Sequence, residues 1–145
     1  MKGLHTYLNF DGNTREAMTF YQQCLGAEMM IQTFGEAGVP IPGAEERIVH
    51  ARLTVGGAIL MASDTPPADS HTPGMETPPF RPGNNFSISI DCESVDEANR
   101  LFAALGEGGT VTMPLMDMFW GAYFGCIVDK FGVSWMFNHE YPKQA

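Results

Sequence analysis

Basic residues are scarce in this sequence of 145 residues. Eight Lys and Arg stand against seventeen Asp and Glu, which gives a formal net charge of −9. Nucleic-acid affinity depends mainly on clustered basic side chains that contact phosphates. The charge balance therefore argues against a nucleic-acid partner.

Cysteines and long apolar runs are also few. The three cysteines, Cys24, Cys92 and Cys126, form no CxxC pair, so the sequence predicts neither a disulfide framework nor a thiolate zinc site. No stretch approaches the roughly 18 to 20 apolar residues of a membrane span, and residues 1–10 lack the pattern of a signal peptide. We expect a soluble, cytoplasmic protein without a membrane partner.

Common catalytic and nucleotide-binding motifs are missing as well. The sequence has no GxSxG elbow, no P-loop and no GxGxxG after a strand. The glycine-rich stretch GEGGT, 106–110, follows an expected helix, so we interpret it as a helix stop and turn. Nothing resembles the glycine loop and acidic ribose contact of a nucleotide-binding βαβ unit.

An internal repeat is the main feature that is present. Residues 8–26 align without gaps with residues 89–107, so that the segments NTREAMTFY and SVDEANRLF coincide. Further along, Met61 after a Gly-Gly turn corresponds to Met136 after a Phe-Gly turn. The two halves of the chain therefore share one pattern.

Each repeat contains one expected amphipathic helix. Asn13 and Ser94 are residues that favour the position before a helix, and Glu16 and Glu97 follow three positions later. This is the capping-box pattern, complete in Ser94/Glu97 and approximate in Asn13/Glu16. Apolar residues recur at helical spacing within each segment.

Strand-like segments surround each helix. One precedes it and three follow it, and in chain order they are 4–10, 27–34, 47–55 and 58–63, then 85–91, 110–115, 122–128 and 133–138. The sequence therefore predicts an α+β fold of two βαβββ modules, residues 1–64 and 86–140.

Residues 65–85 separate the modules. This stretch holds six prolines and two glycines, so it can be neither a helix nor a central strand. A loop of this length is usually functional or mobile, and we expect it to be mobile or to lie over a cavity mouth or a partner. Neither module alone should bury enough apolar area, so we expect both to pack around a shared interior as a single domain, 1–145.

The paired modules resemble the vicinal oxygen chelate superfamily, which includes glyoxalases, extradiol dioxygenases and bleomycin-resistance proteins. The segments YLNFDGNTREAMTFY, GGAILMASD and FWGAYFGCIVDKFGVSWMFN are similar to the PhnB-like branch, whose members are sometimes labelled 3-demethylubiquinone-9 3-methyltransferase. The resemblance implies two curved modules joined into an incomplete barrel with a small-molecule cavity, commonly in a homodimer.

The resemblance also implies four positions that hold a metal in the superfamily's metal enzymes. They fall on His5, Phe86, Met61 and Met136. Only His5 suits zinc, iron or nickel, which need nitrogen or oxygen ligands at sites of this kind. We therefore expect no metal and no other cofactor.

Two strands have a polar face that suits a cavity. Alternation puts His5, Tyr7 and Asn9 on one face of the first strand, and His50 and Arg52 on one face of another. Arg52 is either solvent-exposed or an anion clamp.

Two further features have more than one interpretation. The segment 116–125, MDMFWGAYFG, is either an apolar wall of a pocket or a dimer contact. Asp64 and Asp129 are interpreted as turn residues.

These observations favour binding of a small, partly apolar molecule in a cavity between the modules, without a metal. The candidate ligand-binding residues are His5, Tyr7, His50, Met61, Trp120, Tyr123, Met136 and Asn138.

Whether any reaction is catalysed stays open, because binding alone needs no catalyst. One alternative is a metal-dependent lyase, isomerase or dioxygenase, in which His5 is joined by His50 or by His139 and Glu140. The other takes the methyltransferase label at face value.

Overall fold

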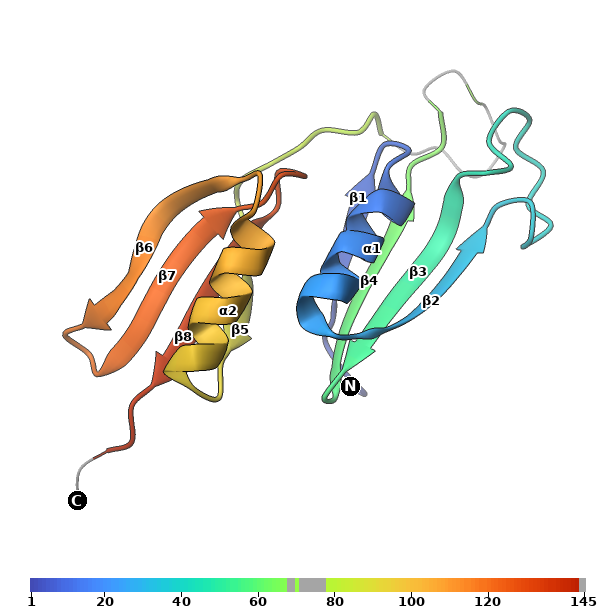
Figure 1. The fold of residues 1–145 in the computed structure, drawn as a ribbon. Coiled ribbons are helices and arrows are strands. Elements are labelled where there is room, and N and C mark those ends of the chain that lie inside the picture. Colours follow the sequence, from blue (N-terminus) through green and yellow to red (C-terminus); the bar gives the residue numbers. More distant parts are fainter. Residues whose placement is uncertain (68–69, 71–77, 144–145) are drawn as a thin grey trace. The chain divides into compact units, whose positions relative to one another are not determined.

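The computed structural model describes residues 1–67, 70 and 78–143. The described residues form two helices and eight strands. The chain divides into two compact units, Met1–Arg81 and Pro82–Ala145, and each has one helix and one four-stranded sheet (Figure 1). The predicted α+β fold with a repeated βαβββ order is confirmed.

The first unit contains five elements. They are β1 (Thr6–Phe10), α1 (Thr14–Leu25), β2 (Glu28–Thr33), β3 (Ile48–Val55) and β4 (Ala58–Asp64). The strand order in the sheet is β1-β4-β3-β2. β1 runs parallel to β4, and the other neighbours are antiparallel.

The second unit repeats this topology. Its elements are β5 (Ile88–Asp91), α2 (Val95–Gly106), β6 (Thr110–Met118), β7 (Ala122–Val128) and β8 (Ser134–Glu140). The order β5-β8-β7-β6, with β5 parallel to β8, matches that of the first sheet. The repeat in the sequence is therefore a repeat in strand pairing.

One face of each sheet packs against the helix of its own unit. In the first unit α1 contacts β2, β3 and β4, and its side chains Ala17, Met18 and Tyr21 are fully buried. In the second unit the rings of Phe102 on α2 and Phe137 on β8 lie 5.4 Å apart, edge to face. Side chains alternate along a strand, so every second residue points to the opposite face.

The two helices begin differently, although both were predicted to have capping boxes. Ser94 Oγ accepts a hydrogen bond from Glu97 N at 3.0 Å, as predicted. The Glu97 carboxylate accepts from Glu93 N at 3.1 Å, one residue before the expected amide. Asn13 makes no side-chain cap, so the prediction for the first helix is wrong.

A small apolar cluster was not predicted from the sequence. Between β2 and β3 the chain makes turns that bury Phe34, Ile41 and Ala44, with Val39 and Val49 packed against them. The loop between β2 and β3 therefore has a small apolar core of its own.

The proline-rich stretch has no helix or strand in its described residues, 65–67, 70 and 78–85. The prediction that it is mobile or covers a cavity mouth falls mainly on residues outside the described ones. Among the helices of the described residues, none is long and apolar enough to cross a membrane.

Candidate ligand-binding faces

The side of the first sheet opposite α1 is called here the first open face. Cross-strand pairing puts Tyr7, Met61, Arg52 and Met30 in one row across all four strands of this face. Tyr7 is 43% exposed and Met30 is 50% exposed. The row joins one phenol, two thioethers and one guanidinium on the face of the sheet that α1 does not cover.

Two predicted site residues meet on this face. The Tyr7 hydroxyl lies 3.1 Å from His50 Nδ1, and the two rings stack with centroids 5.7 Å apart. His50 lies two positions before Arg52 on β3, so both side chains lie on the same face. Tyr7, His50 and Met61 are therefore brought together as one group.

His5 lies just before β1, which begins at Thr6 rather than at Leu4. Its side chain is exposed, and its ring lies over Gly3, where a Cβ atom would come within 2.6 Å of Nε2. The strand that was expected to carry His5 therefore starts one residue after it.

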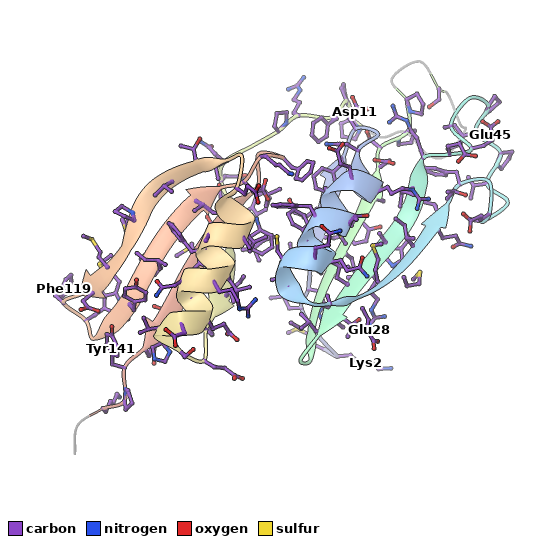
Figure 2. The ribbon with its side chains drawn as sticks, in the orientation of Figure 1. Lys2, Asp11, Glu28, Glu45, Phe119 and Tyr141 are labelled. Atoms are coloured by element: carbon purple, nitrogen blue, oxygen red, sulfur yellow. The ribbon has the colours of Figure 1, made fainter. Side chains whose placement is uncertain are left out.

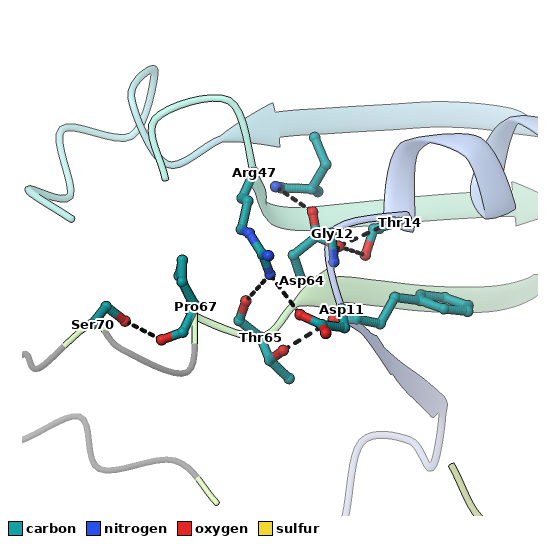
Figure 3. A network of polar contacts seen from close by, with 10 residues as sticks. Asp11, Gly12, Thr14, Arg47, Asp64, Thr65, Pro67 and Ser70 are labelled. Atoms are coloured by element: carbon teal, nitrogen blue, oxygen red, sulfur yellow. Dashed lines mark hydrogen bonds and ion pairs between the residues drawn. The ribbon is translucent and has the colours of Figure 1, made fainter. Parts of the chain in front are cut away.

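Arg52 is exposed, and its side chain forms no ion pair or hydrogen bond within the described residues. Its neighbours across β4 and β2 are Met61 and Met30. Arg47 differs, because its guanidinium binds the Asp11 carboxylate and the Thr65 carbonyl at 3.0 and 2.8 Å (Figure 3). The Arg52 guanidinium thus keeps its donors for other acceptors.

The side of the second sheet opposite α2 is called here the second open face. Its central row contains Ser89, Met136, Cys126 and Met113. Burial raises the pKa of the Cys126 thiol above its ordinary value, so the thiol stays protonated and apolar near neutral pH. This row is more apolar than the corresponding row of the first unit.

A neighbouring row on the second open face contains Asn138, Phe124 and Met116. The ring of Trp120 contacts Phe124 edge to face, with centroids 5.9 Å apart. Phe119, at the turn between β6 and β7, is 97% exposed (Figure 2). Three predicted site residues, Met136, Asn138 and Trp120, therefore gather on or beside this face.

Tyr123 lies on the other face of the second sheet. Its hydroxyl donates a hydrogen bond of 2.7 Å to Asn99 Oδ1, and Asn99 belongs to α2. Alternation along β7 then puts Tyr123 opposite Phe124. The structure does not bring Tyr123 together with the other predicted residues of this unit.

A polar group near the end of β8 was not predicted from the sequence, in which His139 was considered only as a possible metal ligand. The Tyr141 hydroxyl donates to Asp117 Oδ1, and the Tyr141 ring contacts His139 edge to face. His139 Nδ1 lies 2.8 Å from the Cys92 carbonyl oxygen. The hydrogen bond to Asp117 is the main cause that raises the pKa of Tyr141 above its ordinary value, and desolvation is the second cause. No sequence motif marks this group, because its members come together only through strand pairing.

A family model described as 3-demethylubiquinone-9 3-methyltransferase matches residues 2–137 of the chain. This chain belongs to that family. Protein PA1353 from Pseudomonas aeruginosa is 43% identical, with a TM-score of 0.84 and coverage of 97% of this chain and 98% of the other. A protein from Bacillus cereus, described as a putative 3-demethylubiquinone-9 3-methyltransferase and PhnB protein, is 31% identical, with a TM-score of 0.71 and coverage of 95% and 99%.

The superfamily fold is also confirmed. A glyoxylase/bleomycin resistance protein/dioxygenase domain from Frankia sp. EAN1pec aligns with a TM-score of 0.64 over 99% of this chain and 96% of the other. At 15% identity this match shows the fold alone. The resemblance of the chain to the PhnB-like branch of the vicinal oxygen chelate superfamily therefore holds.

The superfamily's metal positions do not fit a metal in this family member. The described residues contain no group of three or more His, Cys, Asp or Glu that could hold an ion. Met61 and Met136 offer thioethers, which are poor ligands for hard divalent ions. The gapless alignment matched His5 with Phe86. In the structure Tyr7 pairs with Met61 and Ser89 pairs with Met136, so Tyr7 corresponds to Ser89 and His5 corresponds to Ser87.

Asp64 has a structural role in this family member. Its Oδ1 accepts hydrogen bonds from Gly12 N, Thr14 N and the Thr14 hydroxyl at 2.9, 3.0 and 2.7 Å, and its Oδ2 accepts from Ile48 N at 2.8 Å (Figure 3). The carboxylate therefore does at α1 what Asn13 was expected to do. It also joins the ends of β3 and β4 to the helix start.

Asp129 is a turn residue, as predicted. Its Oδ1 accepts from Phe131 N and Val133 N at 2.8 and 3.0 Å, and its Oδ2 accepts from Trp135 Nε1 at 2.8 Å. The carboxylate is 3% exposed. It fixes the β7–β8 turn and the indole of the core.

Proposed function

We propose that the chain binds a small, partly apolar molecule on its open sheet faces, without a metal. The proposal is supported above all by the composition of the first open face, where Tyr7 and two methionines flank a few polar donors. Small-molecule sites generally combine apolar and aromatic walls with a small number of polar groups that fix orientation. Thioethers adapt to irregular ligands.

The second open face supports the same function from its own residues. Met136, Met113, Met116 and Phe124 form an apolar surface, and Asn138 adds one amide. Binding requires no catalytic group. The position of the cavity between the two modules stays a prediction.

Methionine methyl NMR tests the proposal directly. Protein labelled with ¹³C at the methionine methyl groups is treated with chelator and titrated with benzyl alcohol. We expect saturable shifts at Met61 and Met30, because their thioethers lie in one row with Tyr7. Met18, which belongs to α1 and is fully buried, is the internal control and should not shift.

The assignments come from single Met→Leu variants, which keep volume and hydrophobicity. Equal shifts at Met18 and Met61 would indicate general unfolding or non-specific partitioning. An absence of saturable shifts on both open faces would contradict the proposal.

The two alternatives predict other results. A metal-dependent enzyme would hold a stoichiometric divalent ion after purification without chelator and would lose it in His5→Ala. A methyltransferase would give a specific, saturable signal with S-adenosylmethionine. Either result would replace binding without a metal as the function.

A further inference from the structure

We infer that the molecule bound on the first open face carries an anionic oxyacid group, such as a carboxylate or phosphonate, which Arg52 receives. This inference rests on the proposed function and adds the chemical class of the ligand. It is carried by the position of Arg52 in the row Tyr7, Met61, Arg52, Met30 and by its lack of an acceptor within the described residues.

The direct neighbours of Arg52 provide no counter-charge. Both cross-strand partners are methionines, and the same-face residues along β3 are His50 and Thr54. One carboxylate, that of Glu28, lies on the same face, because Glu28 pairs with Thr54. Glu28 and Arg52 form no ion pair in the structure. The guanidinium therefore has no acceptor of its own.

Within the described residues Arg15, Arg81 and Arg100 also form no ion pair, so Arg52 is distinguished by its place on an open sheet face in a chain with a net charge of −9. Carboxylates outnumber basic groups about twofold here, and yet Arg52 is flanked by thioethers. A guanidinium presents five donors in a fixed fork that matches the two oxygens of a carboxylate or phosphonate. The arrangement suits an anion that arrives from outside the chain.

His50 adds a second donor beside the guanidinium. When the Tyr7 hydroxyl donates to His50 Nδ1, the proton of the neutral imidazole lies on Nε2. Nε2–H can then donate to an oxygen near Arg52, because both residues share one face of β3. Tyr7 acts here as a positioning residue, since its hydroxyl and its stacked ring hold the orientation of the imidazole.

The apolar neighbours define the rest of the ligand. Met61 and Met30 lie on either side of Arg52, and the Tyr7 ring follows Met61 in the same row. An inorganic anion would leave these side chains without a partner. An organic anion with a ring or short chain would cover them while its charged end reaches the guanidinium.

Benzoate and benzyl alcohol test the inference, because they share a ring and differ in charge. Their dissociation constants are measured by methyl and arginine side-chain NMR with the full chain at about 0.15 M salt, where long-range repulsion by the acidic chain is screened. We expect benzoate to bind about tenfold or more tightly than benzyl alcohol, as charge-assisted hydrogen bonds imply. Inorganic phosphate alone should bind more weakly than phenylphosphonate.

Substitution separates Arg52 from other arginines. Arg52→Gln should weaken benzoate binding about tenfold and leave benzyl alcohol unchanged. Arg15→Gln removes an exposed charge on α1 and should change neither constant. Arg52 is exposed, so the variant should keep the thermal unfolding midpoint of the parent protein.

The outcomes distinguish the inference from the proposed function. Equal binding of benzoate and benzyl alcohol, with no effect of Arg52→Gln, would overturn the inference and leave the proposed function standing. If Arg15→Gln weakened benzoate binding as much as Arg52→Gln, the effect would be due to net charge, and the inference would also be overturned. If neither aromatic probe binds, both the inference and the proposed function fail.

Discussion

Two aspartates near the start of α1 contribute unequally to the stability of the first unit. Asp64 is 4% exposed and accepts four hydrogen bonds, whereas the Asp11 carboxylate makes one ion pair and its side chain is 56% exposed. Buried amides that lose their acceptor cost roughly 1–3 kcal/mol each, while an exposed ion pair contributes about 0–1 kcal/mol. Sequence alone could not separate them, because it does not show that Asp64 reaches the start of α1.

Asp64→Ala should therefore lower the free energy of unfolding by about 3 kcal/mol. Asp11→Ala is the matched control and should cost less than about 1 kcal/mol. Urea denaturation followed by circular dichroism measures both values. Similar costs for the two variants would show that the Asp64 network carries little of the stability of this unit.

Tyr141 should titrate above the ordinary range of a tyrosine. The hydrogen bond to Asp117 favours the neutral phenol, so the folded-state pKa is raised relative to the unfolded chain. Its contribution to stability is present below the unfolded pKa of about 10 and is lost as pH rises through the folded pKa. Tyrosinate absorbance should show this, with Tyr141→Phe identifying the signal.

Asp117→Asn removes the charge and should bring the pKa of Tyr141 down toward its ordinary value. Asp11→Asn serves as the control, since Asp11 lies in the other unit and pairs with Arg47. An unchanged titration of Tyr141 in Asp117→Asn would refute the assignment of the shift to this hydrogen bond.

The sequence predicted part of the residue-level arrangement. Alternation put Tyr7 on one face of its strand and His50 with Arg52 on one face of another, and strand pairing confirms that these are the same side of one sheet. Alternation could not show which face of the second sheet Tyr123 would take, because both faces carry aromatic side chains. That residue is fixed by its bond to Asn99, which only tertiary structure reveals.

Helix starts show how far local patterns hold at the level of elements. The Ser94 pattern forms its predicted bond, whereas Asn13 is replaced by a carboxylate from a distant strand. A local pattern identifies a helix start but cannot show that another residue supplies the acceptor. The start of α2 is therefore encoded locally, and the start of α1 depends on Asp64.

Ser94→Ala should lower stability by about 1 kcal/mol, because the Glu97 amide loses its acceptor. Asn13→Ala should cost clearly less, since the Asn13 side chain caps nothing. Thermal or urea unfolding of the two variants gives the comparison. A larger loss for Asn13→Ala than for Ser94→Ala would contradict the assigned caps.

The alignment of the two modules in the sequence did not give the correct correspondence between their first strands. The gapless alignment fits both helices, yet the pairing of β1 with β4 and of β5 with β8 differs from it by one residue. A slip of one residue exchanges the two faces of a strand. The match of His5 therefore moves from Phe86 to Ser87, and only paired coordinates could reveal this.

At the level of the whole molecule, the fold was predictable because the same pattern of helix and strands occurs twice in the sequence. Helical periodicity, strand alternation and glycine turns recur in the same order, so each half supported the interpretation of the other. The loop that buries Phe34 and Ile41 has no regular period and was missed. The homodimer stays a prediction, and sedimentation analysis of the full chain would measure it.

The central claim is that this chain binds its ligand without a divalent ion. The most direct measurement is calorimetric titration of benzoate into protein before and after chelation, with His5→Ala alongside. The account predicts one dissociation constant for all three samples. Binding that appears only with a divalent ion, and that is lost in His5→Ala, would contradict it.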